Sequence, residues 1–147
     1  MAAGPSTIHA SAVLVGRKAA LIRGPSGSGK SRLAWELIRS ALPFARLVAD
    51  DRAFVEIHSG RPLVRPAPNL AGLIEVRGLG IRRLAYEPVA AVGMLIDLVA
   101  ADAERHPSVG VQEGELEGVR LRRLAFATGI DPLPAVLAEL TTVSSGN

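Results

Sequence analysis

The sequence contains no cysteine, which excludes disulfide bonds and thiolate metal sites and fits a cytoplasmic protein. Aromatic residues make up only 3% of the 147 residues, too few for the stacking platforms that bind single-stranded nucleic acid. No apolar run reaches the roughly 18 to 20 residues that span a bilayer. Residues 1–6 carry no charged side chain, which argues against a secretory signal. We therefore expect a cytoplasmic protein that binds neither membrane nor nucleic acid.

Lysine is nearly absent and occurs twice in the sequence, at Lys18 and Lys30. The net charge of +3 and the isoelectric point near 10.2 therefore come almost wholly from arginine. Such a balance suits anionic partners, such as nucleotides or acidic proteins, and the scattered arginines indicate a solvated surface. With 48% hydrophobic and 21% charged residues, the composition is that of a soluble globular protein, and we expect one domain over residues 1–147.

The hydrophobic pattern predicts short strands with a helix among the first of them. Residues 12–15 and 19–22 are apolar runs on either side of a turn and predict a hairpin. Leucines at helical spacing over residues 31–42 predict a helix that ends at Pro43. Residues 46–49 then form an apolar run that closes on two acids, typical of a buried strand that reaches a polar edge.

The rest of the chain continues the pattern. We expect a hairpin over 53–65, a loop with a strand or turn over 65–81, alternation over 119–124 and a closing helix over 132–140. Residues 88–100 predict another strand, although periodicity alone leaves a buried helix open there. This order indicates an α/β fold with a mixed sheet.

One stretch carries a specific chemical signal, because it matches the phosphate-binding pattern G-x-x-x-x-G-K-[ST] at every position between an expected strand and an expected helix. It consists of Gly24, Pro25, Ser26, Gly27, Ser28, Gly29, Lys30 and Ser31. Glycines let successive backbone N–H groups form an anion cradle, and the helix that follows adds its positive end. Lys30 would reach the terminal phosphates, and the hydroxyl of Ser31 would bind Mg²⁺.

Two adjacent acids follow the strand at residues 46–49. In folds with such a loop, an acid at the end of a neighbouring strand completes the Mg²⁺ shell, and a second acid would accept a proton from an attacking hydroxyl. Asp50 and Asp51 are the candidates. The alternative is an ordinary turn opened by two aspartates.

The segment Leu70 to Ile81, "LAGLIEVRGLGI", closely resembles the signature segment of the HPr kinase/phosphorylase family. The other motifs of that family also occur here in the same order: a histidine opening a strand, a G-x-S-G-x-G-K-S loop and "RLVADDR". The resemblance covers most of the chain from His9 to Ile81, and it is to short forms that consist of the C-terminal catalytic domain. It implies a P-loop kinase core with a mixed β-sheet flanked by helices.

The resemblance also implies a reaction and roles for residues. It implies phosphorylation of a serine in HPr, a phosphocarrier of the sugar phosphotransferase system, by ATP and Mg²⁺, and reverse phosphorolysis that yields pyrophosphate. It matches Lys30 to the nucleotide and Ser31, Asp50 and Glu75 to the metal. Its catalytic positions match Asp51, as base and acid, Asp50, its partner near the metal, and His9, which supports that acid. Arg77 matches the basic neighbour of Glu75.

The late catalytic arginine of the family has its best local match at Arg105, where a surface arginine is the alternative reading. The family further suggests a homo-oligomer, a hexamer. Two other functions stay open from the residues alone: a different P-loop enzyme that phosphorylates a small molecule, and a nucleotide-responsive binding module without turnover.

Overall fold

The computed structural model describes residues 6–40 and 42–145, and its order of elements is that of a mixed α/β fold. The strands are β1 (Ser6–Ile8), β2 (Ala10–Val15), β3 (Lys18–Arg23), β4 (Ala45–Ala49), β5 (Ala53–His58), β6 (Arg61–Pro66), β7 (Leu73–Val76), β8 (Gly80–Arg83), β9 (Ala90–Leu98), β10 (Glu113–Leu116) and β11 (Val119–Phe126). The helices are α1 (Lys30–Ile38), α2 (Leu133–Thr141) and a single 3₁₀ turn at Pro68–Leu70.

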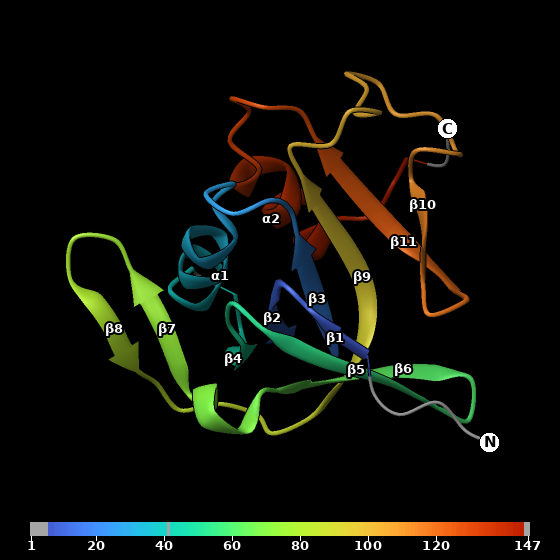
Figure 1. Ribbon diagram of the computed structural model, residues 1–147. Coiled ribbons are helices and arrows are strands. Elements are labelled where there is room, and N and C mark those ends of the chain that lie inside the picture. The colour runs from blue at the N-terminus through green and yellow to red at the C-terminus, as the bar shows by residue number, and fades with distance from the viewer. Residues whose placement is uncertain (1–5, 41, 146–147) are drawn as a thin grey trace.

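Nine of these strands form one sheet, in which β9 is central (Figure 1). The order β1-β5-β6-β9-β3-β2-β4 forms the main path, and β11 joins β9 and carries β10. The pairs β3–β9 and β11–β9 are parallel, while the other pairs are antiparallel. Strands β7 and β8 form a separate antiparallel hairpin. The predicted mixed sheet is confirmed.

Turn chemistry accounts for the hairpins that the sequence predicts. Val15 pairs with Lys18, so β2 and β3 are joined by two residues, of which Gly16 has a φ of 64°. Two-residue turns between antiparallel strands need such positive φ values, and glycine adopts them without steric cost. The β5–β6 turn uses Ser59 and Gly60, both with positive φ, and that predicted hairpin is also confirmed.

The apolar segment over residues 88–100, for which the pattern allowed either a strand or a buried helix, forms strand β9. Parallel pairing with β3 on one edge and β11 on the other places it inside the sheet, and its side chains enter the core clusters on both faces, with Leu95 in one and Ile96 in the other. A strand covered on both faces reads as a continuous apolar run rather than as an alternating one.

Helix α1 is shorter than the sequence predicts, ending at Ile38 and not at Pro43. The hydroxyl of Ser40 donates to the carbonyl of Leu37 at 2.6 Å, and the backbone N–H of Ser40 bonds to the same carbonyl. Such local side-chain bonds compete with further helical turns. No helix of the described chain is long and apolar enough to cross a membrane.

The core lies on both faces of the sheet. One cluster joins the sheet to α1, α2 and β7, with Leu33, Leu37, Ile74 and Val136 among its buried members. The other cluster lies under β5, β6 and β10. The helices α1 and α2 thus share one cluster, and α1 lies between the β7–β8 hairpin and the sheet (Figure 1).

Candidate functional site

The topology brings the glycine loop and the acidic pair to the same edge of the sheet. Strands β3 and β4 are both antiparallel to β2, which lies between them, so they run in the same direction. Gly24 follows the end of β3, and Asp50 follows the end of β4. In α/β sheets, ligands bind at the carboxyl ends of strands that run in parallel.

The residues of the glycine loop lie between β3 and α1, as the sequence predicts. Gly29 has a φ of 98° and caps α1, a conformation that side chains disfavour. At Gly24 the constraint is space, because a Cβ would lie 2.6 Å from Oγ of Ser28 and 3.2 Å from the carbonyl oxygen of Leu98. That Oγ is buried and has no hydrogen-bond partner among the described residues. The loop is therefore a tight cradle with an unsatisfied hydroxyl in it.

Lys30 and Ser31 begin α1 and point back to the loop and the acids. The ammonium of Lys30 donates to the carbonyl oxygens of Gly24 at 2.8 Å and Pro25 at 3.0 Å. The hydroxyl of Ser31 donates to Oδ1 of Asp50 at 2.7 Å. The helix N-terminus and the ammonium make this end of α1 positive, which suits an anion.

Asp50 is the best-connected acid of the site, with only 5% of its surface exposed. Its Oδ1 accepts hydrogen bonds from Ser31 and from Ser11 at 2.6 Å, and its Oδ2 accepts one from the backbone N–H of Glu75 at 3.1 Å. Three donors from three elements hold the carboxylate in place. The sequence analysis missed Ser11; the available signal is a hydroxyl at the start of an otherwise apolar strand.

Asp51, in contrast, is exposed and adopts a φ of 69°. Aspartate and asparagine tolerate this left-handed region better than most residues, and such conformations cluster at functional sites. Among the described residues, its carboxylate has no hydrogen-bond or ion-pair partner. Asp51 is therefore open to solvent and free to meet a ligand.

His9 is exposed and lies close to this turn through strand pairing. Ile8 at the end of β1 pairs with Ala53 at the start of β5. His9 comes directly after Ile8 and Arg52 directly before Ala53, so both lie at the same end of this antiparallel pair. Segments some forty residues apart in the chain thus meet beside Asp51. The role predicted for His9 stays a prediction.

Glu75 lies on β7, where its side chain is exposed while its backbone N–H bonds to Asp50. Arg77 is exposed in the turn between β7 and β8. The signature segment thus contacts the acidic pair through its backbone. Residues 6–40 and 42–145 contain no cluster of three or more histidine, aspartate or glutamate side chains arranged for a metal.

Arg105 lies in the connection between β9 and β10 and is exposed. The neighbouring Glu104 accepts hydrogen bonds from the N–H and the hydroxyl of Ser108, and these bonds lower the pKa of Glu104. Since β9 is parallel to β3, this connection leaves the sheet at the edge that carries the glycine loop. No described contact joins Arg105 to the other candidate residues, so its role stays a prediction.

An ion-pair network that the sequence analysis missed lies next to the loop. Arg23, the residue before Gly24, makes two hydrogen bonds to Asp97 at 2.7 and 2.8 Å, and Arg123 makes a third at 2.6 Å. Arg123 also binds Asp102 with two bonds at 2.8 and 2.9 Å. The partners lie up to 74 residues apart in the chain, so no local pattern reveals them.

Charge is balanced within this network. Burial disfavours the ionised form of Asp97, but the hydrogen bonds and charges of Arg23 and Arg123 outweigh it and lower the pKa of Asp97. The hydrogen bonds from Arg123 lower the pKa of the exposed Asp102. Those bonds to Asp102, together with Asp97, raise the pKa of Arg123 despite its partial burial. The network ties β3, β9 and β11 together at the base of the loop.

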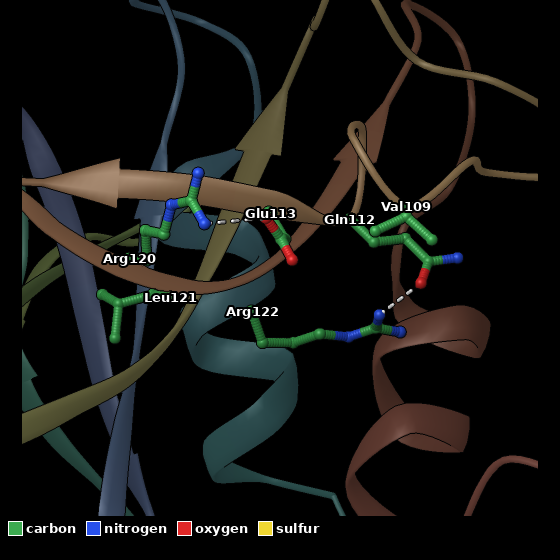
Figure 2. A pocket seen from close by; sticks show the side chains of 6 residues that line it. All are labelled: Val109, Gln112, Glu113, Arg120, Leu121 and Arg122. Atoms are coloured by element: carbon green, nitrogen blue, oxygen red, sulfur yellow. Dashed lines mark hydrogen bonds and ion pairs between the residues drawn. The ribbon is translucent and has the colours of Figure 1, made fainter.

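A cavity of about 350 Å³ lies elsewhere, against β10 and β11 (Figure 2). It is lined by Val109, Gln112, Glu113, Arg120, Leu121 and Arg122. Arg122 donates to Gln112 and to Glu139, and Arg120 faces Glu113 at 4.0 Å. None of the residues predicted for the site lines this cavity, and each of its charged side chains has a partner, Arg122 outside the lining at Glu139.

Comparisons with known proteins match most of the chain. Residues 2–86 match the family model of the HPr Serine kinase C-terminal domain. An HPr kinase/phosphorylase of Geobacillus thermodenitrificans is 32% identical over 152 residues, which cover 95% of this chain and 48% of that protein. One of Limosilactobacillus reuteri is 42% identical over 76 residues, which cover 51% of this chain and 23% of that protein.

The fold is also that of a solved structure, the Hpr(Ser) kinase/phosphatase of Coxiella burnetii. The TM-score is 0.71 at 24% sequence identity, and the match covers 92% of this chain and 93% of that chain. The chain spans less than half the length of the curated relatives it matches.

Proposed function

Because the chain belongs to the family of HPr serine kinase C-terminal domains, we propose that it transfers a phosphoryl group from ATP to a serine of an HPr-type phosphocarrier protein. Residues 1–147 would act as one catalytic domain that regulates a phosphotransferase system in the cytoplasm. The family resemblance also leads us to propose a homo-oligomer, a hexamer.

The observation that carries the proposal is the contact between Ser31 and Asp50 at the base of the glycine loop. The two oxygens lie 2.7 Å apart, beside the ammonium of Lys30 and the positive end of α1. Hydroxyl and carboxylate oxygens are the ligands that Mg²⁺ prefers, and phosphates and water complete its shell in such sites. Ser31 and Asp50 would hold the ion with Glu75, and the bound ion would neutralise charge on the transferred group.

The remaining residues support a transfer step. Asp51 would take the proton of the acceptor serine as its oxygen forms a bond to the γ-phosphorus and the bond to the ADP oxygen breaks. Its exposure and lack of partners favour this role. His9 would support Asp51, with which the β1–β5 pairing aligns it, and Arg105 would neutralise charge from the connection after β9.

We propose that the same residues also run the reverse reaction. An oxygen of inorganic phosphate would attack the phosphoserine, the seryl oxygen–phosphorus bond would break, and pyrophosphate would form. Asp51 would return its proton to the serine oxygen. Phosphate and pyrophosphate are anions that the same loop suits.

Mass spectrometry of the acceptor distinguishes this proposal from its alternatives. Purified protein is incubated with ATP, Mg²⁺ and the HPr homologues of its own genome, and we expect the acceptor to gain one phosphate on serine. A small-molecule kinase, which finds no acceptor in this mixture, and a binding module would both leave the carrier unmodified. An unmodified carrier contradicts the proposal. Added phosphate should then release pyrophosphate from the phosphorylated carrier.

A further inference from the structure

The β7–β8 hairpin contacts the site through its inner strand and leaves its outer strand exposed. It projects from the body of the molecule beside α1 (Figure 1). Glu75 at its inner strand bonds to Asp50 through the backbone, but every residue of β8 is exposed. Leu79 at the tip is 65% exposed and Ile81 on β8 is 61% exposed. Exposed apolar side chains grouped on a projecting element mark an interaction site.

Strand register divides the hairpin into two faces. Directly paired residues of antiparallel strands project their side chains to the same side. Ile81 pairs with Glu75 and Arg83 pairs with Leu73, so these four side chains share one face, which we call the Glu75 face. Arg82 pairs with Ile74, which is buried in the cluster around α1, so Arg82 lies on the opposite face.

The hairpin is basic and its charges are uncompensated. Arg77, Arg82 and Arg83 are exposed, and among the described residues none of them has an ion-pair or hydrogen-bond partner. Over residues 73–83 these three arginines stand against Glu75 alone, a formal charge of 3 − 1 = +2. Arginine with exposed apolar side chains is the composition enriched in protein interfaces.

We propose that the Glu75 face, with Leu79 at the tip, docks the protein acceptor through an apolar and acidic patch beside the acceptor's reactive serine. This inference rests on the proposed function and adds the surface that selects the acceptor. The inner edge of the hairpin bonds to Asp50, so a protein resting on Ile81 and Arg83 lies alongside the acids and the loop. Electrostatic complementarity then orients the acceptor before transfer.

A second copy of the chain fits this face less well. The chain carries a net charge of +3, so a second copy brings a body of the same sign to the basic hairpin. Like charges across an interface oppose association. An acidic acceptor instead supplies a partner charge for Arg83 on this face.

The faces provide a matched pair of variants for the test. Arg83→Glu and Arg82→Glu make the same charge change on adjacent residues of β8 but on opposite faces, and Ile81→Ser removes the apolar contact. The HPr-type carrier is the probe, with KM and kcat measured for the carrier and for ATP. Carrier binding is measured separately by calorimetry, which does not depend on turnover, and the oligomeric state by light scattering.

We expect Arg83→Glu and Ile81→Ser to raise the KM for the carrier about tenfold or more, with KM for ATP and oligomeric state unchanged. Arg82→Glu should change the KM for the carrier by less than about threefold, which reflects charge alone. If the KM for the carrier stays at the unmodified protein's value in all three variants, the docking surface is overturned and the proposed function stands. A changed oligomeric state in Arg83→Glu or Ile81→Ser would identify a contact between copies and also overturn it. If the unmodified protein neither binds nor phosphorylates the carrier, the proposed function fails together with the inference.

Discussion

Asp50 and Asp51 are adjacent in sequence and occupy opposite environments. Asp50 is buried and accepts three hydrogen bonds, while Asp51 is exposed, unpaired among the described residues and held at a positive φ. A carboxylate with three fixed donors is suited to hold a ligand in place, since its position and its charge are both set. A carboxylate open to solvent is suited to exchange a proton with a substrate.

This division predicts the outcome of Asp51→Asn. Asparagine tolerates the left-handed backbone and is isosteric, so the fold and nucleotide binding should persist. Phosphoryl transfer should fall by about 10² or more in both directions, because the amide cannot accept the serine proton. Single-turnover transfer and ATP titration measure the two effects. Transfer near the unmodified rate would rule out Asp51 as the base.

Asp97 gives a prediction of stability against pH. Its pKa is lowered in the folded protein, so its charge stabilises the fold above the ordinary aspartate range, and this contribution is lost as the pH falls through the lowered pKa. Asp97→Asn leaves Arg23 and Arg123 short of a partner and should reduce the free energy of unfolding by about 3 kcal/mol at pH 7. Urea denaturation should show this difference narrowing below about pH 4.

Asp102→Asn is the control for that variant. Asp102 is bound to the same Arg123 but is exposed, so its loss should reduce the free energy of unfolding by less than Asp97→Asn does. If the loss of unfolding free energy in Asp97→Asn were the same at every pH, it would contradict the ion pairs assigned to Asp97.

At the scale of elements, the loop between β3 and α1 depends on the close approach of β9. Gly24→Ala would place a methyl group against Ser28 and Leu98, which should reduce the free energy of unfolding by about 1 to 3 kcal/mol and weaken ATP binding. Adding Ser28→Ala should recover part of the loss, because it removes the closest atom while the Leu98 carbonyl remains. Ser28→Ala alone should be near neutral, since its hydroxyl has no protein partner among the described residues. A double variant no more stable than Gly24→Ala would contradict this packing.

Elements with local signals were predictable from sequence, and those decided by distant neighbours were not. The hairpin turns at Gly16 and at Ser59-Gly60 carry their own backbone requirements, so the pattern predicted them. The pattern of the segment that forms β9 allowed either a strand or a helix, and its pairing with β3 and β11 makes it a strand. In the site, the loop motif and the acid after a neighbouring strand led to the prediction of Ser31 and Asp50 as ligands of one Mg²⁺, and the two side chains are hydrogen-bonded to each other. Ser11 and Asp97 were missed because their partners lie far along the chain.

At the scale of the whole molecule, the parallel strands direct the site to one edge. Strands β3, β9 and β11 end on the same side, and β4 runs in the same direction. The glycine loop, the acidic pair and the connection that holds Arg105 all follow these ends. We therefore expect one phosphate cradle to serve both ATP and the pyrophosphate of the proposed reverse reaction.

Competition for that cradle can be measured as stability of the whole protein. A ligand at about 100 times its Kd stabilises the fold by about 2.7 kcal/mol, which is about 5 to 10 °C in Tm for a chain of this size. With Mg²⁺, ATP and pyrophosphate should each raise Tm, and together they should not add, because they share one site. Lys30→Ala should abolish both shifts, since its ammonium lies against the loop at Gly24 and Pro25. Lys18→Ala, at the other lysine of the chain and outside the loop, should keep both. Additive shifts, or shifts that survive in Lys30→Ala, would place pyrophosphate at a second site and contradict reversal through a single cradle.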